Sequence, residues 1–307
     1  MTDKLMTDRE TGTTGPALDI PGTWNARDVG GRAVPEGSSV PLATGVLLRT
    51  ASLAALQPAG VAVLDDYDVR TVLDLRSPQE VARDGADVVP ASTQVLSLPF
   101  GTPHPEKAPA LADGEDDALP VPQAPAEATG EVASEVAGAD MARVLATLVG
   151  SGVAATADPA ELGQAIMTGI YRRFVTDPAA HEAVGTALTA IASSTHAVLV
   201  HCSAGKDRTG WIVALAQAVC SVPSDQILQE YLLSAGAATE LAAAMPVIPG
   251  VDAALWEAVL TVRPEYLAAA HEEVERSYGS LTAYLDAIGV DADLRALLRA
   301  RFGVAPA

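Results

Sequence analysis

Cysteine is scarce in this chain, and its scarcity excludes two classes of protein. The 307 residues contain only Cys202 and Cys220. Two cysteines cannot build the disulfide framework of a small secreted domain, and neither belongs to a Cys-x-x-Cys pair of the kind that binds zinc. Each cysteine therefore has to be explained alone, as a core residue or as a reactive thiol.

Basic residues and long apolar runs are also few. Lys and Arg number 19 against 39 Asp and Glu, which gives a formal charge of -20. Such a charge repels nucleic acids and anionic membrane surfaces, so we expect no nucleic-acid partner, and an anionic ligand needs a concentrated basic pocket. The longest apolar stretches, such as residues 211–220, are far shorter than the ~20 residues that span a bilayer, so we expect no integral membrane segment.

The N-terminal residues lack the apolar centre of a signal peptide. Residues 1–16 are polar and of mixed charge. We therefore expect a flexible N-terminus over residues 1–19 and a cytoplasmic location, while export by a route without a signal peptide stays open.

Alternating patterns in the first two thirds of the chain predict an α/β fold. A helix is expected to begin near Pro58, followed by strands at residues 69–75 and 94–98. Further on, residues 196–200 are typical of a buried strand, and residues 209–220 are apolar nearly all round, which indicates a buried helix. Strand, loop and helix thus follow one another directly.

The C-terminal third is predicted to be helical. Ser224 and Ser280 are expected to be N-caps, Pro264 to lie in a first helical turn, and Gly279 and Gly289 to end helices. The chain shows no repeat and no convincing domain boundary, so we predict a single domain over residues 20–307.

An insertion interrupts this domain after residue 100. Residues 101–159 are rich in Ala, Pro, Gly and acidic residues, with an acidic cluster at residues 113–117, and helical spacing returns at 141–148 and 162–170. We predict a variable insertion over residues 101–176 that is either a lid over an active site or a tolerated surface segment.

The segment at residues 201–210, His-Cys-Ser-Ala-Gly-Lys-Asp-Arg-Thr-Gly, lies where the predicted strand meets the predicted helix. Phosphoryl transfer to sulfur needs a thiolate, a cradle for the anion and positive charge near the transferring oxygens. A cysteine beside cations at a helix N-terminus can ionise below pH ~7, which makes Cys202 the candidate nucleophile. Arg208 can hold two phosphate oxygens with its planar guanidinium group.

The remaining loop residues are candidates for substrate binding. Their backbone N–H groups are expected to face the phosphate, and these residues are Ser203, Ala204, Gly205 and Lys206. Glycine permits the tight curvature at this point.

Two residues flank the loop. Thr209 is expected to donate its hydroxyl to the Cys202 sulfur. His201 is expected either to orient the backbone of the nucleophile or to tune its pKa, rather than to act as a base.

A purely structural role fits this segment less well than catalysis does. A cysteine at a strand end is often a small core residue, and its spacing to Arg208 alone is a weak signal, but the complete pattern favours catalysis. The segment lacks the first glycine and the hydroxyl residue of a nucleotide P-loop. Cys220, inside the apolar helix, is predicted to be a core residue.

The segment resembles the signature of the protein tyrosine phosphatase superfamily, in which Cys is followed by five residues and Arg. Five further stretches are similar to the bacterial family typified by mycobacterial protein tyrosine phosphatase B: residues 25–31, 48–51, 74–77, 265–267 and 278–280. The similarity runs from about Ile20 to the C-terminus apart from the insertion. It implies a mixed sheet flanked by helices, a two-helix lid, and neither metal nor other cofactor.

The resemblance also implies the substrates. Family members act on phosphotyrosine, and some act on phosphoserine, phosphothreonine or phosphoinositides, so the expected partner is a phosphorylated protein or a phosphoinositide. Lys206 resembles the lysine of phosphoinositide-active relatives, or serves as a general aid to anion binding. Asp28 and Asp74, with Arg27 and Arg76, are expected to form polar pairs that support the site.

The general acid that protonates the leaving group is not evident from the sequence. In many tyrosine phosphatases the acid is an Asp on a separate mobile loop, and the mycobacterial relative carries an Asp shortly after a Leu-Pro-Phe stretch. Residues 98–100 here form the same stretch but are followed by Gly and Thr. Asp207 is our first candidate, because a carboxyl beside a bound dianion is favoured in its protonated form. The alternatives are a structural Asp207 turned toward Arg27, Arg49 or Arg76, the acidic cluster at 113–117, and Asp74.

Two other functions compete with the phosphatase. One is a phosphate-binding module with little turnover, suggested by the missing Asp. The other is a sulfur-transfer or arsenate-reducing enzyme, which the Arg-Thr ending and the lack of a second nearby cysteine argue against.

Overall fold

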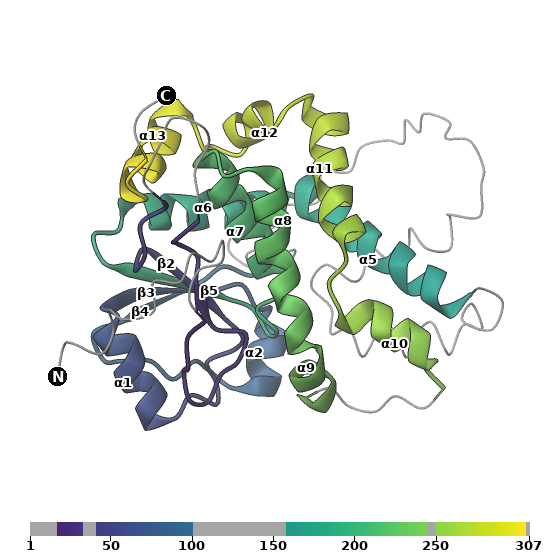
Figure 1. Cartoon of the computed structure of the whole chain (residues 1–307), viewed down its shortest axis with the longest axis horizontal. Helices are drawn as coiled ribbons and strands as arrows, with labels where there is room; N and C mark the ends of the chain where they lie inside the picture. Colours follow the sequence, from purple (N-terminus) through teal and green to yellow (C-terminus); the bar gives the residue numbers. More distant parts are fainter. Residues whose placement is uncertain (1–16, 33–40, 101–157, 245–249, 305–307) are drawn as a thin grey trace, which may run out of the picture.

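A five-stranded mixed sheet lies at the centre of the computed structural model, which describes residues 17–32, 41–100, 158–244 and 250–304 (Figure 1). The strand order is β1-β2-β5-β3-β4; β1 is antiparallel to β2, and the others are parallel. The strands are β1 Arg27–Asp28, β2 Leu47–Thr50, β3 Val69–Asp74, β4 Gln94–Ser97 and β5 Ala197–His201.

Helices surround the sheet, and several of them begin with proline. Proline suits a first turn because its fixed φ is helical and its missing N–H has no partner there. The first six helices of the described chain are α1 Pro58–Asp66, α2 Pro78–Asp84, α5 Pro159–Thr176, α6 Pro178–Ser193, α7 Asp207–Val219 and α8 Ser224–Leu232. The C-terminal elements are the 3-10 helix η2 Leu233–Ala237, α9 Ala238–Ala244, α10 Ala253–Leu260, α11 Pro264–Tyr278, α12 Leu281–Ala287 and α13 Ala292–Arg301.

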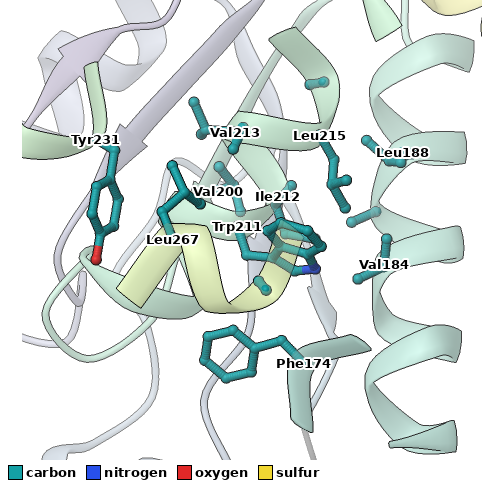
Figure 2. Packing of buried hydrophobic residues seen from close by; sticks show 14 of the residues in the cluster. Phe174, Val184, Leu188, Val200, Trp211, Ile212, Val213, Leu215, Tyr231 and Leu267 are labelled. Atoms are coloured by element: carbon teal, nitrogen blue, oxygen red, sulfur yellow. The ribbon is translucent and has the colours of Figure 1, made fainter. Parts of the chain in front are cut away.

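Both faces of the sheet are covered. On β5, Val198 and Val200 belong to the larger core, and Figure 2 shows Val200 near Trp211 of α7. The alternate residue Leu199 belongs to a smaller core on the other face, together with Leu64 of α1. Because β5 lies among parallel strands and is buried on both faces, its residues from Ala197 to Val200 are all apolar.

The predicted α/β class is confirmed, and most predicted elements are present. Ser280 is the N-cap of α12, Pro264 begins α11, and Gly279 ends that helix in the left-handed conformation. The buried helix α7 begins two residues earlier than predicted. The prediction for Ser224 is wrong, because it is the first residue of α8 and Pro223 occupies the N-cap position without a side-chain bond.

The predicted insertion is described only in its last part. Residues 159–176 form α5, which buries Ile166 and Phe174 in the larger core and packs against α10 and α11. Residues 101–157, with the predicted acidic cluster, and residues 1–16 lie outside the described residues. In the described part of the chain every helix is too short or too polar to cross a membrane; the cytoplasmic location stays a prediction.

Candidate active site

Three parallel strands end at the same edge of the sheet. Thr50 of β2 and Asp74 of β3 both pair with His201, the last residue of β5. Cys202 follows directly at this edge. In open α/β sheets ligands bind outside the carboxyl ends of such strands, so the sheet places the Cys202 loop where a substrate site is expected.

The loop after Cys202 presses against the end of β2 at Gly205. The φ of Gly205 is +63°, in the left-handed region that favours glycine. A Cβ at this position would lie 2.0 Å from the carbonyl oxygen of Thr50. Conformation and close contact both require glycine, so the path of the loop is fixed at this point.

The carbonyl groups at the start of the loop are bound by the surrounding frame. The Nδ1 atom of His201 lies 3.2 Å from the Cys202 oxygen. The backbone N–H of Ser52, just after β2, donates to the Ser203 oxygen at 3.1 Å. Both carbonyls therefore point outward from the loop.

The next carbonyl groups are bound in the same way. The side-chain amide of Asn25 donates to the oxygens of Ala204 and Gly205 at 3.1 and 2.9 Å. Arg49 also donates to Gly205 and, at 3.4 Å, to Lys206. In a trans peptide the N–H points opposite to the C=O, so the N–H groups of residues 203–207 point away from this frame. The loop can thus offer several N–H donors to one anion.

Arg208 is held by a carboxylate that sequence analysis missed. Its guanidinium group forms two hydrogen bonds of 2.6 Å with Glu80 and one of 3.2 Å with the Leu75 carbonyl. Ser203 also donates to Glu80 at 2.7 Å. Burial opposes ionisation of Glu80, but the charge and hydrogen bonds of Arg208 hold its pKa far below the ordinary value.

Glu80 lies in the first turn of helix α2. Ser77 and Glu80 form a capping box, in which the Ser77 hydroxyl accepts from the Glu80 N–H at 3.2 Å and Glu80 accepts from the Ser77 N–H at 2.7 Å. The Ser-x-x-Glu spacing is a sequence signal that could have predicted the helix. Its contact with Arg208, 128 residues away, has no local signal.

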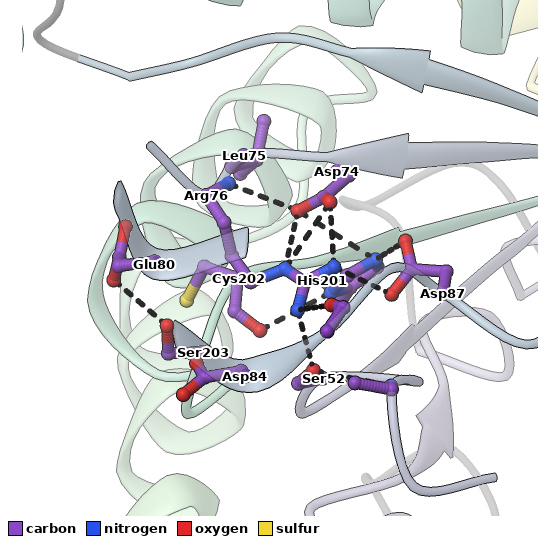
Figure 3. A network of polar contacts seen from close by, with 12 residues as sticks. Ser52, Asp74, Leu75, Arg76, Glu80, Asp84, Asp87, His201, Cys202 and Ser203 are labelled. Atoms are coloured by element: carbon purple, nitrogen blue, oxygen red, sulfur yellow. Dashed lines mark hydrogen bonds and ion pairs between the residues drawn. The ribbon is translucent and has the colours of Figure 1, made fainter. Parts of the chain in front are cut away.

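Cys202 lies at the inner end of the loop, close to Glu80 and Ser203 (Figure 3). The residue is 2% exposed, and its sulfur is near enough to Arg208 for their charges to interact. The predicted bond from Thr209 to this sulfur is not formed, because the buried Thr209 hydroxyl has no hydrogen-bond partner among the described residues. Cys220 is also buried, and burial raises its pKa to about 12, which suits a core residue.

The side chain of Lys206 was predicted to bind substrate, but it binds two backbone carbonyl groups instead. Its ammonium group donates to the carbonyl oxygens of Val259 and Thr261, at 2.7 and 3.0 Å, and the residue is 2% exposed. The side chain therefore joins the loop to the end of α10. Only the backbone of Lys206 is placed to serve an anion in the loop.

Asp207 does not pair with any of the three arginines considered from the sequence. Its Oδ1 accepts a hydrogen bond of 2.8 Å from the Tyr171 hydroxyl, and its Oδ2 lies 3.4 Å from the Lys206 ammonium. The side chain is 22% exposed. The alternative of a structural carboxylate turned toward those arginines is wrong.

Arg27 and Arg49 instead share the buried carboxylate of Glu230, at 2.7 and 2.8 Å. Burial and the charge of Arg49 lower the pKa of Arg27 to about 10. The predicted pairing of Arg27 with Asp28 is wrong, since Asp28 accepts from the N–H groups of Gly30 and Gly45. Glu230 of α8, which sequence analysis missed, thus ties β1 and β2 to the loop frame.

The other predicted pair is in contact and belongs to a larger network (Figure 3). Arg76 donates to both oxygens of Asp74, at 2.8 to 3.1 Å, and to Asp87 at 2.8 Å; His201 lies 2.9 Å from Asp87. Burial alone would raise the pKa of Asp87, but the bond to His201 and the charge of Arg76 lower it. Asp74 is therefore committed to Arg76 and is a poor candidate for the acid.

This network contains the group of described residues whose ligand atoms lie close enough to hold a metal ion, namely Asp74, Asp87 and His201. The guanidinium group of Arg76 already contacts both carboxylates. Because a cation occupies the space between them, the residues do not fit a metal site.

Comparisons with known proteins agree with this geometry. A family model described as "Tyrosine phosphatase family" matches residues 18–303. The chain is 34% identical over 289 residues to the "Triple specificity protein phosphatase PtpB" of Mycobacterium tuberculosis, covering 89% of this chain and 94% of that protein. It is 30% identical over 272 residues to a protein of Cupriavidus necator that is provisionally named a tyrosine-protein phosphatase, covering 87% and 82%.

Proposed function

Because the chain belongs to the tyrosine phosphatase family, we propose that it hydrolyses phosphotyrosine through a phosphocysteine formed on Cys202. Phosphatase activity follows from the family, and the assignment of residues is the proposal. One observation supports it: the carbonyl groups of the loop are bound by the surrounding residues, so that its N–H groups face the other way, and Arg208 lies near enough to the Cys202 sulfur for their charges to interact.

The first step exchanges one bond to phosphorus for another. The Cys202 thiolate forms a sulfur–phosphorus bond while the bond to the ester oxygen breaks, and its electron pair leaves with that oxygen. Arg208 and the loop N–H groups neutralise charge on the three remaining oxygens. Asp207 donates a proton to the leaving oxygen, a contribution worth roughly 10²–10⁴-fold.

The second step restores the enzyme. A water oxygen attacks phosphorus, the sulfur–phosphorus bond breaks, and the electron pair returns to the Cys202 sulfur. Asp207 takes the proton that the attacking water loses, so inorganic phosphate is released and the acid is ready for another cycle.

We also propose that the substrates extend beyond phosphotyrosine. The relative from Mycobacterium tuberculosis is named for triple specificity. In the proposed site the loop N–H groups and Arg208 contact the phosphate, and only Asp207 acts on the leaving oxygen; an alcohol oxygen can accept that proton as well as a phenol oxygen can, so the chemistry does not require a phenol. Parallel assays on phosphotyrosine, phosphoserine and phosphothreonine peptides and on a phosphoinositide test this; hydrolysis of phosphotyrosine alone would contradict it.

Replacement of the nucleophile tests the mechanism. Cys202→Ser should reduce hydrolysis of p-nitrophenyl phosphate to the background rate while phosphate binding persists, because the anion cradle remains and the nucleophile does not. Cys220→Ser is the matched control and should retain activity. Rapid quenching of the wild type should reveal one phosphocysteine per chain; binding without this intermediate would favour the phosphate-binding module, and activity in Cys202→Ser would refute the mechanism.

A further inference from the structure

Two buried tyrosines lead to the candidate acid, and the proposed mechanism does not use them. The Tyr171 hydroxyl of α5 donates to Oδ1 of Asp207 at 2.8 Å. The Tyr231 hydroxyl of α8 lies 2.7 Å from the Tyr171 hydroxyl. Both tyrosines are fully buried. Side chains from two helices therefore form one line of hydroxyl groups that ends on the first residue of α7.

The direction of the hydrogen bonds in this line is fixed. Burial and the negative charge of Asp207 raise the pKa of Tyr171, so its hydroxyl stays protonated. A hydroxyl has one proton, and Tyr171 gives it to Asp207; Tyr231 must therefore donate to Tyr171. Burial and the charge of Asp207 also raise the pKa of Tyr231, which keeps it a donor.

We propose that Tyr171, supported by Tyr231, is a positioning residue that fixes which oxygen of Asp207 transfers the proton. With Oδ1 occupied by the Tyr171 hydroxyl, Oδ2 is the oxygen that carries and delivers the proton to the leaving group. This inference rests on the proposed function, in which Asp207 is the general acid.

Other charged and titratable groups act on Asp207 from the elements around it. On its own loop these are Lys206, 3.4 Å from Oδ2, and Arg208. From α11, Tyr266 interacts with it electrostatically, but the Tyr266 hydroxyl donates to the Ala258 carbonyl at 2.7 Å. Tyr266 therefore lies near Asp207 without belonging to the line of hydroxyl groups, which makes it a suitable control.

The test is Tyr171→Phe, measured on a series of phosphate esters with leaving groups of increasing basicity. We expect kcat for an alkyl phosphate to fall roughly five- to tenfold, and kcat for p-nitrophenyl phosphate to fall less than about twofold, because poor leaving groups need the aimed proton most. The limb of the pH–rate profile that requires a protonated acid should move to higher pH, since the ionised Asp207 loses a hydrogen-bond donor. Tyr231→Phe should produce smaller changes in the same direction.

Tyr266→Phe is the matched control, and neither its dependence on the leaving group nor its pH limb should change. Equal losses on all esters with an unmoved pH limb in Tyr171→Phe would show a structural role only and overturn the inference. The double variant with Asp207→Asn distinguishes the role of Tyr171 from the proposed function. If Tyr171 acts through Asp207, Tyr171→Phe should have no leaving-group effect in that background. An effect of Tyr171→Phe that survives in that background overturns the inference alone, whereas activity in Cys202→Ser overturns the proposed function.

Discussion

At Gly205 a side chain is disfavoured for two reasons, the left-handed backbone conformation and the close contact with β2. In Gly205→Ala the new Cβ would lie 2.0 Å from the Thr50 oxygen at a φ of +63°. We expect activity to be lost and the free energy of unfolding to fall by about 3 kcal/mol, because the loop has to move away from β2. Gly279→Ala is the control: its φ is +74° with no atom within 4 Å, so it should cost only about 1 kcal/mol and leave activity unchanged. Urea unfolding and phosphatase assays measure both variants, and similar losses in the two would contradict the role of the contact.

A second prediction at the residue scale concerns the pH dependence of stability that Glu80 produces. Since the folded state lowers the pKa of Glu80, its contribution to stability is fully present above the ordinary value of 4.5 and is lost as pH falls below that value. Glu80→Gln should cost about 3 kcal/mol at pH 7, because it leaves Arg208, whose side chain is only 16% exposed, without its carboxylate partner. We expect the difference between the free energies of unfolding of wild type and variant to become smaller as pH is lowered from 5 to 3. Urea unfolding of both proteins at each pH measures this difference. A difference that is constant across this range would show that Glu80 is not ionised against Arg208.

At the scale of elements, the capping box of α2 links helix stability to the site. Ser77→Ala removes the bond to the Glu80 N–H, and we expect a loss of about 1 kcal/mol together with a several-fold fall in kcat, because Glu80 no longer holds Arg208 firmly. Ser280→Ala removes an equivalent N-cap bond of 3.1 Å from α12, which lies apart from α2 in Figure 1. The control should lose similar stability and keep its activity. Loss of activity in both variants would mean that the effect is not carried by Glu80.

The elements that could be predicted are those whose signals are local. The apolar run of β5, the proline at the start of α11 and the serine cap of α12 each depend on neighbours within a turn or a strand. Helix α2 was missed because seven residues are too few for a clear helical period, although its capping box was readable. Ser224 was predicted to be an N-cap, but α8 begins one residue earlier than that prediction requires, so that Pro223 is the N-cap.

The site shows the same division. The positions of Cys202, Arg208 and Gly205 could be predicted from one decapeptide, because a strand, a tight loop and a helix dictate them. Their partners could not be predicted in this way: Glu80 lies 128 residues from Arg208, and Glu230 lies 203 residues from Arg27. Asp87 lies 114 residues from His201. Lys206 was misread for the same reason, since the carbonyls that bind it belong to α10 and the turn after it.

At the scale of the whole molecule, the net charge of -20 should discriminate between substrates. An acidic phosphopeptide is repelled on approach and a basic one is attracted, and salt screens both effects. We expect kcat/KM for the acidic peptide to rise, and that for the basic peptide to fall, as NaCl is raised from about 10 to 150 mM. Steady-state assays with a pair of peptides that differ only in flanking charge measure this. The same salt dependence for both peptides would show that the charge of the protein does not act on association.

The groups that bind the loop after Cys202 come from widely separated parts of the chain. Asn25 binds the loop from near the N-terminus, Glu80 from α2, and Val259 and Thr261 from the end of α10. During synthesis these segments leave the ribosome at widely separated times. We therefore expect a growing chain to remain catalytically silent until its last third has emerged, so that folding itself delays the appearance of dephosphorylating activity in the cell.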